Sequence, residues 1–367
     1  MNRDTMGIIS DSPTTCELKR HSRIDLLCLG VLLMTTMAIR RSAALFLSLT
    51  CLFCTIPASA QSRRASDSQA TTQPGTLWSD EKILETVNAV SMGPKLLPEA
   101  WPNHARVAVL ITFDDDTQAP LLRDGTTEPT ALSASDYGAQ TGTPRLLEIL
   151  DRHNIPATFF VTGVDAMIHP ELVPSILKSG RNEIGIHGWI HEYPPGLDSE
   201  AEEERLLDKA IAKISSLTGK KPAGYRAPSW AFSSYTMDLI KKKGFLYDSS
   251  LQASEVPYKI FAKGQDTGVV ELPIDWTLTE TVYLGAQGHM PSPDLLFQLY
   301  KQEFDGAYKE GTTFILTMHP YLGGHRAPMQ HLDDLLTYMQ SKPGVWFTTG
   351  EQLADYAKQS AAATKSN

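Results

Sequence analysis

Hydrophobic and polar positions alternate along most of the chain in a rhythm that predicts strands and helices in turn. Residues 106–113 form a continuous apolar run, which is typical of a strand buried on both faces. Further strands are predicted at residues 157–161, 183–186, 314–318 and 345–347. Helical spacing of apolar residues predicts helices at 144–153, 171–179, 199–217, 328–340 and 351–358. A long, polar, glycine-containing stretch at 117–142 has no predicted element.

This alternation predicts parallel βαβ units, arranged as a doubly wound sheet or a barrel. The clearest helix, at 199–217, has a capping-box pattern at its start, formed by Ser199 and Glu202. Gly219 follows its end, where glycine commonly stops a helix. The chain contains no internal repeat and no phosphate-binding loop.

The first sixty residues have a different pattern. Arg40 and Arg41 precede an apolar run at 43–53, and the Ala-Ser-Ala at 58–60 matches a cleavage signal. A basic stretch, a short apolar core and small residues before the cut are the three parts of a secretory signal peptide. We therefore predict that residues 1–60 are a signal peptide region and that the protein is exported, to the periplasm or the extracellular space.

Two alternatives bear on this segment. Translation can also begin at Met37, just ahead of the basic pair. An uncleaved membrane anchor, helped by the apolar run at 26–34, is the other alternative. Neither run reaches the ~20 apolar residues that a span requires, so we expect no stable membrane span after cleavage.

The remaining organisation is simple. Residues 61–77 are expected to be a flexible leader rich in Ser, Gln, Thr and Ala, residues 78–360 one domain, and residues 361–367 a tail. All 4 cysteines precede residue 61, so the cleaved chain has no thiol for a metal, a nucleophile or a disulfide. The net charge of −9 argues against nucleic acid as a partner. The oligomeric state is left open.

Candidate chemistry begins directly after the first predicted strand, at Asp114, Asp115 and Asp116. Three adjacent carboxylates repel one another and cannot all be charged comfortably without a cation. A solvated acidic loop is the alternative interpretation.

Two histidines, His187 and His191, follow the strand predicted at 183–186. Imidazoles four residues apart fall on one face of a helical turn and can share a metal. A chance pair among 10 histidines is the alternative. Two histidines and a carboxylate would leave positions on zinc open for water and substrate. Glu192 would orient a ligand or lie at the surface.

Two more polar residues are placed near predicted strand ends. Arg226, in the segment 224–230, would hold a carboxylate base ionised if the acidic cluster lies nearby. His319 follows the strand at 314–318 and would lie on the same rim, which favours a general acid over a structural histidine.

The order and spacing of these motifs resemble the polysaccharide deacetylase family, which has the NodB homology fold. They are Thr-Phe-Asp-Asp at 112–115, His-x-x-x-His at 187–191, Arg-Ala-Pro-x-Trp at 226–230 and Met-His-Pro at 318–320. The resemblance is nearest to the peptidoglycan deacetylase and allantoinase-like branch, and it covers about residues 104–357. Further similarity lies at 137–147, 155–161 and 242–250. The family fold implied is a distorted (β/α) barrel, with 78–360 as the catalytic domain.

The resemblance also implies a role for each candidate residue. Asp114 would be the base that takes a proton from water, and Arg226 would tether it. His319 would protonate the departing amine. His187 and His191 would bind Zn²⁺ or another divalent metal.

The third metal ligand has two candidates. The general deacetylase pattern implies Asp115, whereas the Asp-x-Asp spacing of the peptidoglycan-deacetylase-like branch implies Asp116. Alternation along a strand points Asp114 and Asp116 the same way, so we prefer Asp116.

The function implied is a metal-dependent hydrolase that removes N-acetyl groups from a glycan such as peptidoglycan. Two departures leave the substrate open: Gly188 stands where relatives often have Ser or Thr, and Ser229-Trp230 where they tend to have Tyr. The alternatives are hydrolysis of a cyclic amide or ureide such as allantoin, an esterase acting on O-acetyl groups, and a non-catalytic glycan-binding relative. The predicted signal peptide weighs against the cyclic ureide.

A first prediction concerns export. We expect the mature N-terminus to be Gln61, because the cleavage signal ends at Ala60. N-terminal sequencing of protein recovered from its native host would measure it. Recovery of chains that still begin upstream of Arg40 would show that this segment is not cleaved.

Overall fold

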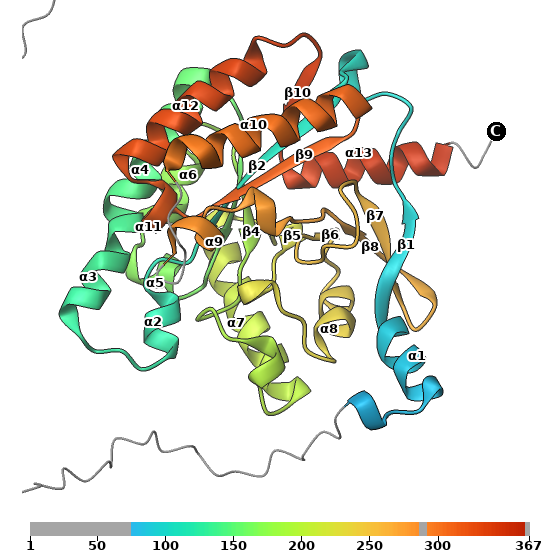
Figure 1. The fold of residues 1–367 in the computed structure, drawn as a ribbon. Coiled ribbons are helices and arrows are strands. Elements are labelled where there is room, and N and C mark those ends of the chain that lie inside the picture. The colour runs from blue at the N-terminus through green and yellow to red at the C-terminus, as the bar shows by residue number, and fades with distance from the viewer. Residues whose placement is uncertain (1–74, 286–291, 364–367) are drawn as a thin grey trace, which may run out of the picture. The chain divides into compact units, whose positions relative to one another are not determined.

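A ten-stranded, mostly parallel sheet carries the fold (Figure 1). The computed structural model describes residues 75–285 and 292–363. The predicted signal peptide, nearly all of the predicted leader and the last four residues lie outside these ranges. Within them, no helix combines the length and the apolar character needed to cross a bilayer.

Neighbouring strands follow the chain order through the middle of the sheet. The parallel strands are β2 (Val107–Asp115), β3 (Thr158–Val161), β4 (Glu183–Ile186), β5 (Gly224–Tyr225), β6 (Tyr247–Asp248), β8 (Gln265–Glu271), β9 (Thr313–Met318) and β10 (Val345–Thr348). At one edge, β7 (Tyr258–Ala262) and β1 (Val90–Lys95) add antiparallel strands. The sheet is curled into a half-barrel, and a bridge between Thr279 and Thr317 links β9 to the segment that follows β8. The predicted distorted (β/α) barrel is therefore confirmed.

Helices connect the strands; most of them cover the outside of the sheet, and the last one packs on its inner face (Figure 1). They are α1 (Asp80–Asn88), α2 (Ala119–Arg123), α3 (Pro129–Tyr137), α4 (Thr143–His153), α5 (Asp165–Ile168), α6 (Leu172–Leu177), α7 (Glu200–Thr218), α8 (Thr236–Lys242), α9 (Thr281–Leu284), α10 (Pro293–Glu310), α11 (Pro320–Gly323), α12 (Arg326–Gln340) and α13 (Gly350–Ala363). The five predicted helices are present, although α13 is longer than predicted. The stretch at 117–142, which had no predicted element, contains α2, α3 and a short π-helix at Gly138–Gly142.

The caps predicted for the helix at 199–217 are those of α7. The Ser199 hydroxyl accepts the backbone N–H of Glu202 at 3.2 Å. Gly219 ends the helix in the left-handed region, with φ of 75°, which glycine adopts without a steric penalty.

Alternation along β2 explains why its sequence is a continuous apolar run. Its odd-numbered residues, from Val107 to Phe113, pack in the large core beneath the outer helices. Ala108 and Leu110 face the inside of the curled sheet, where they join a second apolar cluster that includes Leu353 of α13. Both faces of the strand are therefore buried. Asp114, an even-numbered residue, follows on the inner face at the carboxyl end.

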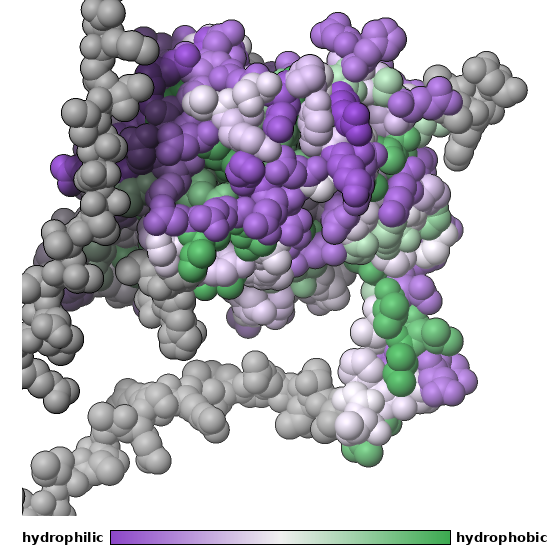
Figure 2. Space-filling view, turned by 45° about the horizontal axis from the view of Figure 1, so that its top comes forward, coloured by the Kyte–Doolittle hydropathy of each residue, from purple (hydrophilic) through white to green (hydrophobic). Residues whose placement is uncertain are grey.

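Helix α1 and the short 3-10 helix before it, Gly75–Leu77, carry the most exposed apolar residues near the start of the described chain (Figure 2). They are Leu77, Ile83, Leu84 and Val87. None of the candidate site residues lies on either helix.

Candidate active site

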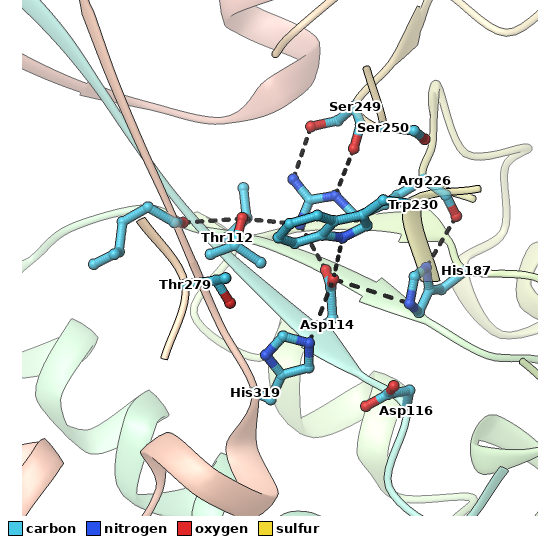
Figure 3. A network of polar contacts seen from close by, with 12 residues as sticks. Thr112, Asp114, Asp116, His187, Arg226, Trp230, Ser249, Ser250, Thr279 and His319 are labelled. Atoms are coloured by element: carbon cyan, nitrogen blue, oxygen red, sulfur yellow. Dashed lines mark hydrogen bonds and ion pairs between the residues drawn. The ribbon is translucent and has the colours of Figure 1, made fainter. Parts of the chain in front are cut away.

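Asp114 lies at the carboxyl end of β2, and two side chains from the segment after β5 hold it (Figure 3). Nη1 of Arg226 donates to Oδ1 at 2.6 Å, and Nε1 of Trp230 donates to Oδ2 at 3.1 Å. Burial would raise the pKa of Asp114. The charge of Arg226, with smaller effects from His187 and His319, outweighs burial and holds that pKa far below its ordinary value.

Arg226 is itself fully buried and fixed from several sides (Figure 3). Nη1 also donates to Oγ1 of Thr112 at 3.0 Å, while Nε and Nη2 donate to the carbonyl oxygen and hydroxyl of Ser249 at 2.8 and 2.7 Å. The guanidinium carbon lies 4.1 Å from the ring centre of Phe160. Arg226 and Asp114 thus form a direct, buried ion pair.

The structure brings Asp116, His187 and His191 together, with ligand atoms all within 4.8 Å of one another. Nε2 of His191 lies 3.1 Å from Oδ2 of Asp116. Nδ1 of His187 lies 2.9 Å from the carbonyl oxygen of Arg226, an arrangement in which Nδ1 carries the proton and Nε2 is left free for a metal.

The donor set fits a divalent metal. Two imidazoles and one carboxylate are ligands that zinc commonly takes in hydrolases, with a position left for water. Oδ1 of Asp116 is buried and has no hydrogen-bond partner within the described part of the chain. Burial lowers the pKa of His187 to about 4, so its imidazole is neutral at pH 7, as a ligand must be.

Asp115 lies apart from this set. Its Oδ2 accepts a hydrogen bond from Oγ1 of Thr143 at 2.7 Å. Burial raises the pKa of Asp115 to about 7, whereas the contact with His191 outweighs burial and lowers the pKa of Asp116. Asp116 is therefore the carboxylate whose ionised form is favoured beside the histidines.

The two histidines do not lie on a helical turn, so that expectation is wrong. Gly188 and His191 both have positive φ, 74° and 54°, and the segment between them is a loop. The buried Glu192 carboxylate accepts the backbone N–H groups of Trp189 and Ile190 at 2.9 Å. Glu192 is thus not a surface residue. Its hydrogen bonds shape the loop that brings the two imidazoles together.

Gly188 is explained by space as well as by conformation. A Cβ atom at this position would lie 2.7 Å from Cγ of Pro228 and 3.0 Å from the Glu192 carboxyl carbon. Ser or Thr would therefore clash and strain the backbone here, which accounts for the departure noted in the sequence.

His319 follows β9 and faces Asp114 from the other side (Figure 3). Its Nε2 lies 3.7 Å from Oδ2 of Asp114, and its Nδ1 lies 3.3 Å from Oε2 of Glu280. Glu280 also accepts the backbone N–H of His319. Burial alone would lower the pKa of His319, but the Glu280 carboxylate raises it to about 9.

These groups share one pocket of about 250 Å³. Its lining residues are Asp114, Asp116, His187, His191, Ser229, Trp230, Trp276, Thr281, His319 and Tyr321. The indole rings of Trp230 and Trp276 lie 4.3 Å apart at its wall, and Trp276 is 47% exposed. A larger cavity of about 570 Å³ beside α10 contains no histidine and none of the candidate residues.

Several residues of the site were not predicted. Glu280 and Trp276 lie in a segment without a motif that sequence analysis could use, and Tyr321 follows His319 without a distinguishing pattern. Arg123, from α2, donates to the carbonyl oxygen of His191 at 2.8 Å and pairs with Asp124. The contacts of Glu280 with His319 and of Arg123 with His191 join residues 39 and 68 positions apart, so local patterns carried no signal for them.

Comparison with known proteins gives the family. The sequence profile for polysaccharide deacetylase matches residues 103–247. A peptidoglycan deacetylase of Helicobacter pylori is 30% identical over 261 residues, which cover 63% of this chain and 88% of that one. The chain belongs to the polysaccharide deacetylase family.

Solved structures agree with this assignment. The crystal structure of a Mycobacterium smegmatis protein assigned to the polysaccharide deacetylases has 34% identity and a TM-score of 0.67, covering 74% of this chain and 96% of that one. The Puue allantoinase has 24% identity and a TM-score of 0.64, covering 72% and 94%, and this likeness concerns the fold alone.

Membership in the polysaccharide deacetylase family makes this protein a hydrolase acting on carbon–nitrogen bonds. Deacetylases of this family depend on a metal in general, and the cluster at Asp116, His187 and His191 offers this chain a site for one.

A second prediction concerns this cluster. Replacing His187 or His191 by Ala should abolish tight zinc binding, because a site with two protein ligands loses most of its affinity. Asp116→Asn should release metal and Asp115→Asn should not, since only Asp116 lies with the histidines. Metal content per chain after dialysis, measured by plasma mass spectrometry, tests this. Stoichiometric zinc in both histidine variants would contradict the ligand set.

Proposed function

We propose that this protein removes acetyl groups from N-acetylated sugar units of a glycan, with peptidoglycan as the first substrate to test. The observation that carries the proposal is the position of Asp114 and His319, 3.7 Å apart, beside the candidate metal cluster in one pocket. Amide hydrolysis needs such a pair, because one group must accept a proton and another must donate one.

Asp116, His187 and His191 would hold the metal, which we propose to be zinc. When bound, zinc polarises a carbonyl oxygen and lowers the pKa of a water molecule. The pKa of Asp114 lies so far below its ordinary value that the carboxylate is charged throughout the pH range of an activity assay. The acidic limb of the rate profile should therefore report another group.

Two residues of this chain carry out the proton transfers. Asp114 accepts a proton from the attacking water as the water oxygen forms a bond to the acetamide carbon. His319 donates its proton to the nitrogen as the carbon–nitrogen bond breaks, so acetate and a free amine leave. With a pKa of about 9, His319 is protonated at neutral pH and ready for this step. Arg226 and Trp230 keep Asp114 aimed at the pocket.

The pocket suits a sugar of a longer chain. Trp230 and Trp276 give it an aromatic wall that is partly exposed, and apolar faces with a few polar groups are typical of ligand pockets. The relative in Helicobacter pylori is named for peptidoglycan, which supports starting there. We further propose that residues 78–360 form the catalytic domain and that the protein acts after export.

Acetate release measured by mass spectrometry tests the proposal. Purified, zinc-loaded protein would be incubated with N-acetylglucosamine oligosaccharides, peptidoglycan fragments, an O-acetylated glycan and allantoin. Deacetylation of an N-acetylated glycan is the expected result. Hydrolysis of allantoin alone, or of the O-acetyl ester alone, would favour those alternatives, and binding without turnover would indicate a non-catalytic relative.

A third prediction concerns the acid–base pair. Asp114→Asn and His319→Ala should each lower turnover by roughly 10²–10⁴-fold, because each removes one proton-transfer group. Both variants should keep their metal, since neither residue belongs to the metal cluster. If His319→Ala retains nearly full activity and the same alkaline limb, His319 is structural and the acid lies elsewhere.

A fourth prediction concerns Glu280. Its negative charge raises the pKa of His319, so Glu280→Gln should lower that pKa toward the ordinary value of ~6.5. The acid then loses its proton sooner as pH rises, and the alkaline limb of kcat/KM should move to lower pH. The matched control is Glu148→Gln on the exposed face of α4, which should leave the profile unchanged. An unmoved alkaline limb in Glu280→Gln would contradict the assignment.

A further inference from the structure

The π-helix at Gly138–Gly142 belongs to a segment, residues 137–147, that carries part of the family resemblance but has no role in the proposed chemistry. It joins α3 to α4 and contacts α11, the short helix that begins directly after His319 (Figure 1). Such π-helical turns are rare and occur frequently at functional sites. The π-helix contacts α11, which follows His319, and Thr117, which follows Asp116.

Gly142 lies directly against Pro320. A Cβ atom at Gly142 would lie 2.1 Å from the carbonyl oxygen of Pro320 and 2.8 Å from its carbonyl carbon. The φ of Gly142 is −65°, an ordinary helical value, so its backbone conformation does not require glycine. The close approach of α11 requires it.

Gly138 lies four residues earlier and makes a similar approach. A Cβ atom there would lie 2.6 Å from Cγ2 of Thr117 and 3.2 Å from the backbone nitrogen of Tyr321. Thr117 follows Asp116, whereas Tyr321 belongs to α11. Because they have no side chain, Gly138 and Gly142 let two segments pack closely against the π-helix. These are the segment that follows Asp116 and helix α11, which follows His319. We call this pair of glycines the seat.

Side chains next to the two glycines hold the π-helix against the segment that follows α11. Oη of Tyr137 and Nη1 of Arg145 donate to the carbonyl oxygen of Gly324, at 3.3 and 3.2 Å. The ring of Tyr137 stacks on that of His325, with centroids 4.1 Å apart and an interplanar angle of 6°. On the other side, Thr143 holds Asp115, the residue between the base and the metal-binding carboxylate.

We propose that the turn from Gly138 to Thr143 is a positioning element that sets the separation between His319 and Asp114. It would act on His319 through the seat under α11 and on the acidic cluster through Thr143. The inference rests on the proposed function, in which these two residues are the acid and the base.

The consequence of filling the seat follows from packing. A Cβ atom of residue 142 has to be at least about an ångström farther from the Pro320 carbonyl oxygen, because protein interiors leave no room for closer contacts. The Pro320 atoms in this contact are backbone and cannot rotate away, so we expect α11 and the neighbouring His319 to shift. A misplacement of about 1 Å of a catalytic group can cost ~10²-fold in rate.

The experiment compares Gly142→Ala with Gly306→Ala in the full chain. Both introduce a better helix former into a helix, but residue 306, in α10, has nothing within 4 Å of an added Cβ atom. We expect Gly142→Ala to lower kcat by ~10²-fold with KM changed by only a few-fold and metal content unchanged. Gly306→Ala should match the unmodified protein in all three measurements. A crystal structure of Gly142→Ala should show His319 Nε2 displaced from its separation of 3.7 Å from Asp114 Oδ2.

The result that overturns the proposal is a folded Gly142→Ala protein with unchanged kcat, or one whose acid–base separation is unchanged. A lower Tm with the same kcat would show that the turn serves stability alone. If Gly142→Ala does not fold, Gly138→Ala replaces it in the same measurements. It should give a smaller fall of ~10-fold in kcat, since its contact with the backbone of α11, at Tyr321, is less close at 3.2 Å. If neither the unmodified protein nor Gly306→Ala releases acetate, the proposed function fails. Crystal structures of the unmodified protein and of Gly142→Ala, compared with each other, still decide the positioning role.

Discussion

The site depends on one buried ion pair, between Arg226 and Asp114. Both side chains are almost completely inaccessible to water, so each charge would be costly without the other. Removing one partner of such a pair typically destabilises a protein by ~3–5 kcal/mol, because it leaves an uncompensated buried charge. The guanidinium is stabilised further by its hydrogen bonds to Thr112 and Ser249.

This pair also connects strands that the sheet itself joins weakly. β5 and β6 contain two residues each, and two strands lie between β5 and β2 in the sheet. Short strands supply few ladder hydrogen bonds, so side-chain bonds across the inside of the curled sheet add to them. Arg226 links the end of β5 to β2 and to the segment after β6. Its carbonyl oxygen accepts from His187, and therefore one residue orients both the base and a candidate metal ligand.

The sequence was informative where chemistry and local pattern coincide. The run at 106–113 predicted β2 because both faces of that strand are buried, and the spacing of His187 and His191 predicted a pair that the fold brings together. The predicted helical turn between the histidines was wrong, because the positive φ of Gly188 and the hydrogen bonds from Trp189 and Ile190 to Glu192 impose a loop that spacing does not encode. Glu280 could not be predicted either, since its partner lies in another segment.

The three consecutive carboxylates at the end of β2 belong to identical residues but differ in how readily they ionise. Asp114 faces Arg226 and is ionised, and Asp116 is kept charged by His191. Asp115 accepts a hydrogen bond from Thr143 and contacts neither Arg226 nor His191, and burial raises its pKa to about 7, so it is mostly neutral below that pH. Because Asp115 is mostly neutral, the repulsion among the three neighbouring carboxyl groups is reduced, and each of them does not need a cation of its own. Alternation along the strand separates base and ligand from the middle residue, and the environments then push their pKa values apart, as differing roles in acid–base chemistry require.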